Sequence, residues 1–287
     1  MSNILITGSN GQLGQSFKYY ASKYQELNFI YKDFSQLNIC DENQLRNFLE
    51  SDKISFLINC AAYTNVDAAE EEIEKAQKIN ANAVEILTHL SLEYQFKLIH
   101  FSTDYVFDGN SNKPYVENSE VLPQGIYGKT KAEGEKVILN SNADAWIIRT
   151  SWLFSPFGKN FVKKILFLLQ KENKINVISD QIGSPTYALD LARDILKILS
   201  DKIPNNGSKI FHYTNAGQTT WYEFALKIKE LSKLSCNINP IETNKFRSSA
   251  KRPKYSVLSS ENFKKEFKIR PRPWELALED CLFKMIK

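Results

Sequence analysis

Short, continuous apolar runs recur along the first half of the chain, separated by stretches of mixed polarity. The runs, predicted to be strands, lie at residues 3–7, 28–33, 54–60, 96–102 and 145–150. Between them the apolar positions repeat at helical spacing, notably over residues 41–49 and 66–94. Continuous apolar strands that alternate with helices are typical of a parallel sheet covered on both faces. The pattern therefore predicts an α/β fold, a Rossmann-type doubly wound parallel sheet.

After residue 150 the pattern loosens into shorter elements. Helices are predicted over residues 161–170, 188–199 and 220–231, with extended pieces at 174–178 and 211–214. Residues 235–287 are interpreted as an irregular region of still shorter elements. We find no internal repeat and no low-complexity linker. We therefore predict a sheet domain over residues 1–152 and a smaller mixed α/β domain over 153–287, with segments near 175–200 returning to the sheet.

Three glycines follow the first predicted strand, Gly8, Gly11 and Gly14, just before a predicted helix. Glycine allows positive φ and close backbone approach, and a helix N-terminus favours a pyrophosphate, so the loop predicts dinucleotide binding. Asp33 ends the second strand, where it can accept hydrogen bonds from a ribose and so favours NAD. Lys32 beside it keeps NADP open. The alternatives are a loop that is rich in glycine for other reasons and an Asp33 that caps a turn.

Polar side chains end the strand at 96–102 and begin a helix soon after. Tyr127 and Lys131 are four residues apart, so they share a helix face, and an ammonium beside a phenol favours the phenolate. The pair can deliver a proton to an alkoxide as hydride reaches a ketone, while Thr103 hydrogen-bonds the same oxygen. The alternative is a chance spacing on a helix where Tyr packs and Lys is solvated. The strand-end position of Thr103 favours the catalytic interpretation.

Other polar features have simpler interpretations. The small residues at 59–62 either let a cofactor pass or pack a helix on the sheet. The histidines at 89, 100 and 212 are too scattered for a metal site or a triad and are interpreted as structural. The acid-rich stretch 66–72 is explained by the dipole of a helix start.

Composition narrows the class of protein without defining its chemistry. The 287 residues are 43% hydrophobic and 24% charged, as in globular proteins. The net charge of +4 is too mild to predict a nucleic-acid partner, and no apolar run is long enough to cross a bilayer. The start MSNILITG is unlike a secretory signal, and the four cysteines show no disulfide or metal spacing. We expect a cytoplasmic protein with no membrane partner.

The small net charge conceals a basic segment. Residues 245–273 hold ten Lys or Arg against two Glu, a local charge of +8, so the remaining residues sum to −4. This segment is either a solvated face or a cradle for a phosphorylated substrate, and the two interpretations have equal weight.

With these residues in view, the sequence resembles the extended short-chain dehydrogenase/reductases, and within them the dTDP-4-dehydrorhamnose reductases. The resemblance covers almost the whole chain and is carried by GSNGQLG, NCAAYTNVDAAE, STDYVFDG, YGKTKAEGE, RTSWLF, QIGSPTYALDLA and RPKYSVLS. It implies NAD(P)H-dependent reduction of the 4-keto group of dTDP-4-dehydrorhamnose to dTDP-L-rhamnose, in nucleotide-sugar and cell-surface polysaccharide biosynthesis. Tyr127 would be the proton donor, assisted by Lys131 and Thr103.

The resemblance also implies binding residues. The dinucleotide would contact Gly8, Asn10, Gly11, Gln12, Leu13, Gly14, Asp33, Asn38, Ile39, Ala61, Ala62, Tyr63, Phe101, Tyr127 and Lys131. The dTDP-sugar would contact Thr103, Asp104 and Trp152, and in the basic segment we choose Arg252. This chain departs from the family at two positions: it has Asn38 where the family usually has an acid, and Phe34 where the family often has an arginine. The choice between NADH and NADPH therefore stays open. Some members form a dimer with Mg²⁺ at its contact; a homodimer is allowed here, but no ligand cluster supports a metal.

Two alternatives remain. The first keeps the fold and reduces a different 4-keto-6-deoxy nucleotide sugar. The second is a non-catalytic regulatory subunit similar to the β subunit of methionine adenosyltransferase, which binds a dinucleotide without turning over a sugar. The presence of Thr103, Tyr127 and Lys131 together favours an enzyme.

Overall fold

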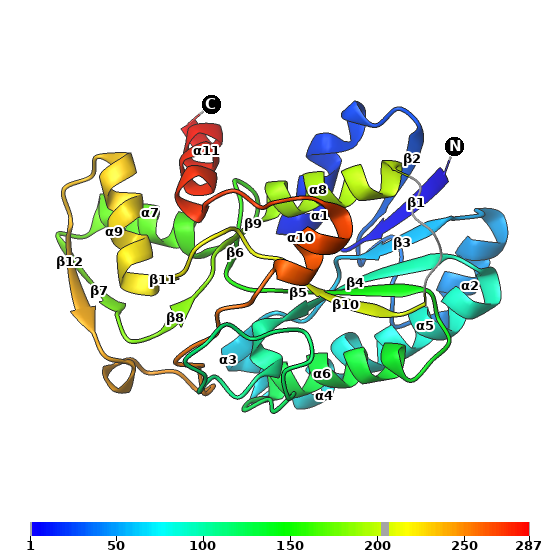
Figure 1. The fold of residues 1–287 in the computed structure, drawn as a ribbon, viewed down its shortest axis with the longest axis horizontal. Coiled ribbons are helices and arrows are strands. Elements are labelled where there is room, and N and C mark those ends of the chain that lie inside the picture. The colour runs from blue at the N-terminus through cyan, green and yellow to red at the C-terminus, as the bar shows by residue number, and fades with distance from the viewer. Residues whose placement is uncertain (1, 202–206, 287) are drawn as a thin grey trace.

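A six-stranded parallel sheet dominates the computed structural model, which describes residues 2–201 and 207–286 (Figure 1). The strand order is β10-β5-β4-β3-β1-β2, so the direction in which strands are added reverses at β1. Ligands of such sheets bind beyond the carboxyl ends of the strands at this reversal. The strands are β1 (Ser2–Thr7), β2 (Leu27–Lys32), β3 (Phe56–Asn59), β4 (Lys97–Thr103), β5 (Ala145–Thr150) and β10 (Lys209–His212). The predicted doubly wound fold is confirmed.

Successive residues of each central strand point to opposite helical layers. Ile4 and Ile6 pack in the layer of α1 (Gln12–Tyr20), α8 (Ala188–Ser200) and α10 (Glu261–Phe267). Leu5 packs in the opposite layer, formed by α2 (Glu42–Ser51), α5 (Ala83–Tyr94) and α6 (Ile126–Leu139). All three side chains are fully buried. Burying each such side chain contributes about 1.5–3 kcal/mol to folding. Because both faces of the sheet are covered by helices, every position of a central strand gains from being apolar, which explains the continuous apolar runs.

The helical pattern at 66–94 is broken in the structure, where one long helix was predicted. It divides into α3 (Val66–Ala69), α4 (Ile73–Gln77), a π-helical turn (Lys78–Asn82) and α5. Inside the π-turn the buried Asn80 side chain accepts from the Tyr63 N–H and donates to the Tyr63 carbonyl. These two bonds fasten the loop after β3 to the helical layer, so the widened turn places an amide where the loop needs it.

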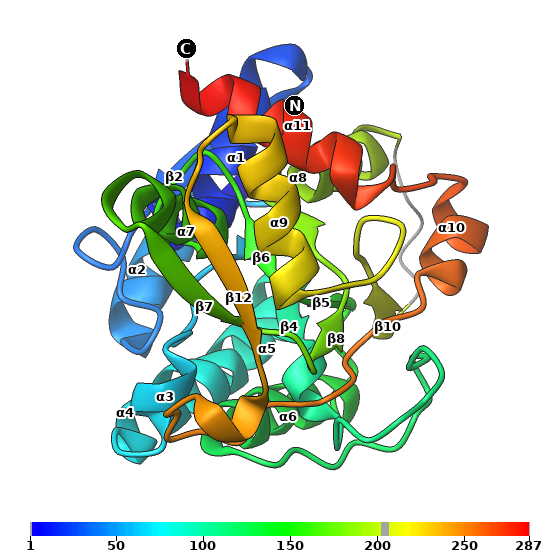
Figure 2. The same cartoon turned by 90° about the vertical axis from the view of Figure 1, so that its left-hand side faces the viewer.

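The second half of the chain builds a smaller unit beside the carboxyl ends of the sheet (Figures 1 and 2). Its core joins buried side chains of α7 (Phe161–Lys171), α9 (Trp221–Ser232) and α11 (Trp274–Ile286). The short strands pair in twos: β7 (Lys174–Ile178) with β12 (Asn237–Ile241), β8 (Ile182–Gly183) with β11 (Thr219–Thr220), and β6 (Leu153–Phe154) with β9 (Thr186–Tyr187).

Segments after residue 152 divide between the two units. Helix α8 covers the large sheet and β10 extends it beyond β5, whereas β7 pairs with β12 in the smaller unit. The interpretation of 235–287 as short and irregular was wrong for α11, which has 13 residues. Its buried residues Trp274, Ala277, Leu278, Cys281 and Leu282 show helical spacing that could have been recognised.

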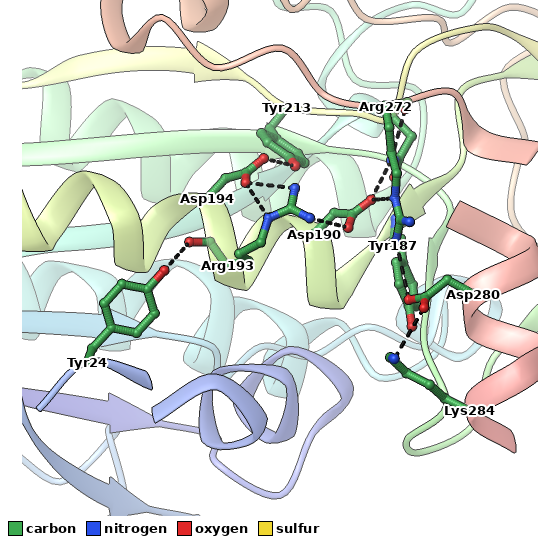
Figure 3. A network of polar contacts seen from close by, with 10 residues as sticks. Tyr24, Tyr187, Asp190, Arg193, Asp194, Tyr213, Arg272, Asp280 and Lys284 are labelled. Carbon is green, nitrogen blue, oxygen red and sulfur yellow. Dashed lines mark hydrogen bonds and ion pairs between the residues drawn. The ribbon is translucent and has the colours of Figure 1, made fainter. Parts of the chain in front are cut away.

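A buried ionic network ties α8 to the segment that leads into α11 (Figure 3). Asp190 of α8, almost fully buried, accepts from Arg193, Arg272 and Asn215. Arg272 also pairs with Asp280 of α11. In the same network Tyr213 donates to Asp194 at 2.7 Å. The network fixes how the C-terminal helix lies against the sheet unit.

Small helical turns complete the chain: η1 (Ala21–Lys23), η3 (Asp104–Val106) and η4 (Thr243–Lys245). Among the helices of the described residues, none has the length and apolar character needed to cross a membrane.

Candidate functional site

A cleft of about 580 Å³ opens at the carboxyl ends of β1, β3, β4 and β5. One wall comes from the glycine loop and the start of α1, and the floor from the ends of β3 and β4. The other wall comes from residues 150–153, 158–160, Trp221 and Arg252. Of the predicted site residues, this cleft brings together Gly11, Gln12, Leu13, Ala62, Phe101, Thr103, Asp104, Tyr127, Lys131, Trp152 and Arg252.

The glycine loop is shaped by close backbone packing. Gly8 has φ +60°, and a Cβ there would lie 2.6 Å from the Ala61 nitrogen. A Cβ on Gly14 would lie 2.6 Å from the Gly8 carbonyl oxygen. Leu13 anchors the helix start in the core. Because α1 begins at Gln12 with its N-terminus at the cleft, these residues fit the pyrophosphate of a dinucleotide.

Other predicted cofactor residues lie around the loop without lining the cleft. Asp33 accepts from Asn10 and from the backbone and hydroxyl of Ser35, so it does cap a turn, and these bonds lower its pKa. Asn38 accepts from the Cys40 N–H, and Ile39 is buried. The Ala61 N–H donates to Asn59, whereas Tyr63 packs against Ala69 and Ala76. In this structure these side chains serve the loops that surround the cleft.

Thr103 and Tyr127 meet at the floor of the cleft. Thr103 ends β4, and Tyr127 lies in the first turn of α6, two residues after the Gly125 N-cap. Burial raises the pKa of Tyr127 to about 12, although a hydrogen bond with Thr103 lowers it. Burial of Tyr127 thus acts against the phenolate that a neighbouring Lys131 ammonium was expected to favour. The phenol keeps its proton at neutral pH, which is the form that a proton donor needs.

Lys131 lies one helical turn beyond Tyr127 and is buried. Its Nζ donates to the Phe101 carbonyl at 2.7 Å and lies 3.1 Å from His100 Nε2. Burial lowers its pKa to about 8, while Glu135 raises it. His100, interpreted from sequence as structural only, thus contacts a predicted catalytic residue.

Asp104 follows Thr103 and is also buried. Its Oδ1 accepts from the Thr103 hydroxyl at 3.0 Å. Burial raises the pKa of Asp104 to about 6, although bonds from Ser256 and Thr103 lower it. Three neighbouring groups, Asp104, Tyr127 and Lys131, are therefore all displaced by burial toward their uncharged forms.

Two tryptophans form an aromatic wall above this floor. Trp152 has φ +47°, uncommon for a bulky residue, and stacks on Trp221 with ring centroids 3.5 Å apart and planes 9° apart. Its indole lies over Gly183, where a Cβ would approach within 2.5 Å. The stack needs both the strained backbone and the glycine, which is typical of a wall that contacts a ligand.

Arg252 closes the cleft from the C-terminal segment. It pairs with Asp67 of α3 at 2.6 Å, and Asp67 also accepts from Ser248 and the Ala250 N–H. Burial raises the pKa of Asp67, but these partners outweigh it and the net direction is down. The helix-dipole interpretation of Asp67 was therefore incomplete. A second hollow, about 290 Å³, adjoins the cleft at Tyr105 and Arg252.

The basic segment divides between two places. Lys251, Arg252 and Lys254 border the second hollow. Four cations, Lys264, Lys265, Lys268 and Arg270, line a separate open depression at α10. Several are paired with acids, among them Lys264 with Glu261 and Arg272 with Asp190. The segment is therefore partly a solvated face, and its Arg252 lines the cleft.

No cluster of three or more His, Cys, Asp or Glu suited to a metal ion occurs among residues 2–201 and 207–286.

Comparison with known sequences decides the family. The chain matches the family described as RmlD substrate binding domain over residues 1–286. It belongs to this family. The resemblance to the dTDP-4-dehydrorhamnose reductases is thereby confirmed at the level of the family.

Individual RmlD-family proteins are similar over nearly their whole length. A dTDP-4-dehydrorhamnose reductase of Aggregatibacter actinomycetemcomitans is 36% identical over 98% of both chains. Spore coat polysaccharide biosynthesis protein SpsK of Bacillus subtilis is 37% identical over 98% of this chain and 97% of its own. The crystal structure of a dTDP-4-dehydrorhamnose reductase from Bacillus anthracis in complex with NADP has 34% identity and a TM-score of 0.93, with 99% of each chain covered.

Sequence reasoning missed part of this RmlD-family cleft. Trp221 completes the aromatic wall from another unit, and the Gln12 side chain accepts from Ser155 and Asn160 across the cleft. No local pattern signals these contacts because they join positions far apart in the chain. Further lining residues that were not proposed are Thr64, Val66, Ser102, Tyr105, Thr150, Ser151, Leu153, Gly158, Lys159 and Asn160.

Proposed function

We propose that this protein reduces the 4-keto group of dTDP-4-dehydro-6-deoxy-L-mannose to give dTDP-L-rhamnose, with NADPH or NADH as reductant. One observation carries the proposal: Thr103, Tyr127 and Lys131 line the same cleft as the glycine loop of a dinucleotide-binding fold. Similarity to proteins named dTDP-4-dehydrorhamnose reductase supports the substrate.

A bound nicotinamide dinucleotide would supply the hydride that C4 of the sugar receives. Tyr127 donates its hydroxyl proton to the C4 oxygen as the alkoxide develops, so the ketone becomes an alcohol. Thr103 donates a hydrogen bond to the same oxygen and orients it. Lys131 would hydrogen-bond a ribose hydroxyl of the dinucleotide, and its ammonium gives a proton back to the Tyr127 phenolate, leaving a neutral amine that solvent protonates again. Trp152 and Trp221 pack against the sugar, and Arg252 pairs with its diphosphate.

The two ends of the dinucleotide are held differently. The start of α1 and the glycine loop would bind the pyrophosphate, with Ala62 and Phe101 beside the nicotinamide half. Asp33, bonded to Asn10 and Ser35, would accept the adenosine ribose hydroxyls. Phe34 next to it is 74% exposed and carries no charge for a 2′-phosphate, so we expect NADH to be used as well as NADPH.

The Tyr127→Phe variant tests the proton donor. Loss of the phenol proton should lower kcat about 10²–10⁴-fold while dinucleotide affinity stays unchanged. The assay follows NAD(P)H oxidation with enzymatically generated dTDP-4-dehydro-6-deoxy-L-mannose and identifies the product by NMR. Tyr19→Phe, a matched change at an exposed tyrosine, should retain wild-type turnover. Near wild-type turnover in Tyr127→Phe would reject this mechanism.

A second sugar is supported by the similarity to SpsK, whose 37% identity is close to the 36% of the Aggregatibacter reductase. The reaction would be the same at a different 4-keto-6-deoxy nucleotide sugar. NMR of the product distinguishes the two, because the configuration at C4 and the ring substituents differ. Co-purification of a synthetase partner, with no oxidation of NAD(P)H in the presence of any keto-sugar, would favour the regulatory-subunit interpretation.

A further inference from the structure

Lys131 is the end of a buried chain of polar contacts that crosses the centre of the sheet. Its Nζ lies 3.1 Å from Nε2 of His100, and Nδ1 of the same ring lies 3.2 Å from Nδ2 of Asn59. His100 is fully buried and Asn59 is 1% exposed. Both ring nitrogens of His100 therefore face nitrogen atoms, and each contact needs one donor and one acceptor.

Backbone geometry fixes which atom donates at the Asn59 end. Asn59 Oδ1 faces the Ala61 N–H at 3.2 Å, and a backbone N–H can only donate. The Thr7 hydroxyl donates to the same oxygen at 2.7 Å. The amide oxygen is thus turned away from the ring, and Nδ2 must donate to His100 Nδ1.

The tautomer of His100 follows from this assignment. Burial, with the nearby Lys131 charge, lowers the pKa of His100 well below its usual range, so the ring is neutral. Since Nδ1 accepts, the single ring proton is on Nε2 and points at Lys131. A neutral Lys131 amine can accept a hydrogen bond from Nε2–H of His100. A Lys131 ammonium has no free lone pair, so its N–H would face the ring N–H with no acceptor between them.

Other charges near Lys131 do not remove this conflict. Glu135, on the next turn of α6, favours the ammonium but is itself bonded to Arg149 of β5 at 2.6 Å. Tyr127 on the same helix stays protonated, and burial favours a protonated Asp104 in η3. Toward the π-helical turn, α6 presents Thr130, which is bonded to Asn80; neither side chain titrates.

We propose that His100 is a positioning residue whose tautomer is coupled to the charge of Lys131. With a neutral amine the ring carries its proton on Nε2. When Lys131 becomes an ammonium the ring carries its proton on Nδ1, so the pair takes up one proton in total and the ring stays neutral. The Asn59 amide must then turn its oxygen to Nδ1, which breaks the Ala61 bond and disfavours the ammonium.

The role of this coupling rests on the proposed function. After Tyr127 gives its proton to the sugar oxygen, the phenolate must be reprotonated before the next turnover. A lysine whose ammonium form is disfavoured releases a proton more readily than an ordinary lysine. His100 and Asn59 thereby tune the group that restores Tyr127 without touching substrate.

Nitrogen NMR of the substrate-free protein tests the coupling directly. The chain has three histidines, so ¹⁵N-histidine spectra are simple, and the signals lost in His100→Gln identify the His100 ring. We expect His100 to be an Nε2–H tautomer above the titration of Lys131 and an Nδ1–H tautomer below it. Lys131 is followed by ¹³Cε labelling and assigned with Lys131→Arg. A tautomer that is unchanged through the lysine titration, or an imidazolium, would overturn the proposal.

Two variants test the same point from opposite sides. His100→Gln offers an amide oxygen to the ammonium, and Asn59→Asp keeps an acceptor for Ala61 while fixing Nδ1–H on the ring. Both should raise the pKa of Lys131 by about one to two pH units, the size expected for a hydrogen bond to a charged group. His89→Gln, at an exposed position on α5, should leave it unchanged. An unchanged pKa in both folded variants would reject the coupling.

These readouts separate this proposal from the proposed function. Both NMR titrations use the protein without substrate, so they stay informative if no keto-sugar is reduced. Where reduction is observed, the pH profile of kcat/KM should shift with the pKa of Lys131 in the same two variants. If His100 were only structural, its substitution would lower stability but would move neither the titration of Lys131 nor the pH profile of kcat/KM.

Discussion

Burial sets the protonation of single residues in and around the cleft more than charged neighbours do. It raises the pKa of Tyr127 to about 12 and of Asp104 to about 6, and it lowers that of Lys131 to about 8. In each case desolvation favours the uncharged form. At neutral pH only the Tyr127 phenol is therefore held firmly in its uncharged form, whereas Asp104 and Lys131 titrate closer to neutrality than an ordinary carboxyl or amine.

His212 shows the same effect outside the cleft and gives a prediction for stability. Burial, followed by the Arg149 charge, lowers its pKa to about 3. Its pKa in the unfolded chain is near 6.5, so below that pH the unfolded chain binds more protons and folding weakens. As pH falls from 6.5 toward 3, this residue should cost up to about 1.4 kcal/mol of unfolding free energy per pH unit.

Chemical denaturation over a pH series measures this contribution. His212→Gln should reduce the slope of the unfolding free energy against pH, below pH 6.5, by the amount that corresponds to about one bound proton. Exposed His89→Gln should keep the wild-type slope. Equal slopes in the His212 variant and the wild type would contradict the buried neutral state. Asp104, whose pKa is raised, contributes with the opposite sign between about pH 6 and 4.

At the scale of elements, the start of α1 and the loop before it form one rigid unit. Gly14 lies in the first turn of the helix, and the Gly8 carbonyl and Ser9 occupy the space that a Cβ at this position would need. The helix can approach the loop only because that side chain is missing. The distance between the helix N-terminus and the cleft is set by this contact.

The Gly14→Ala variant should weaken dinucleotide binding. The added Cβ would lie 2.6 Å from backbone atoms that cannot yield, so the helix start must shift. We expect the Kd for NADPH or NADH to rise about tenfold or more, since overpacking costs ~1–3 kcal/mol. Titration by cofactor fluorescence measures the Kd. The control is exposed Lys18→Ala on the same helix, and an equal Kd in both variants would refute the argument.

The sequence predicted elements where local pattern and core position agree. The run Ile4–Ile6 defines a strand buried on both faces, and Thr103, Tyr127 and Lys131 converge because a strand end and a helix start share one sheet edge. Contacts between remote positions could not be predicted. Asp67 and Arg252 meet across 185 positions, and no periodicity relates them.

At the scale of the whole molecule, buried charge fixes how the C-terminal helix lies on the sheet unit. Asp190 is almost fully buried and is bonded to Arg193 and Arg272, whose side chains are 39% and 32% exposed. Loss of the acid therefore leaves two arginines that water can partly reach, which moderates the cost.

Asp190→Asn should lower the unfolding free energy by about 1–3 kcal/mol, because charge-assisted bonds to both arginines are lost. Guanidinium denaturation measures the change, and limited proteolysis should cut first in the segment before α11. Glu230→Gln, which breaks the exposed pair with Lys227, should cost at most about 0.5 kcal/mol. Equal stability of the two variants would show that the network does not hold the C-terminal helix.

Arg252 links the C-terminal segment to α3 across the cleft, and its loss should weaken the binding of dTDP. Arg252→Ala should raise the Kd for dTDP about tenfold, because a charge-assisted bond to phosphate contributes about 1.5–3 kcal/mol. Calorimetry measures this Kd, and the Kd for the dinucleotide should not change. The matched change Lys229→Ala on α9 should affect neither. Unchanged affinity for dTDP in Arg252→Ala would remove it from the substrate site.

The late position of β10 in the sequence leaves the nascent chain with an incomplete sheet during part of its synthesis on the ribosome. Strand β5 is complete at Thr150, but its outer neighbour arrives only with residues 209–212, and the cover from α8 ends at Ser200. Until then Trp146 and Ile148 stay exposed to solvent on a sheet whose outer strand has unpaired backbone groups. During that stretch of translation the nascent protein is most prone to aggregate, and there a chaperone would be most useful.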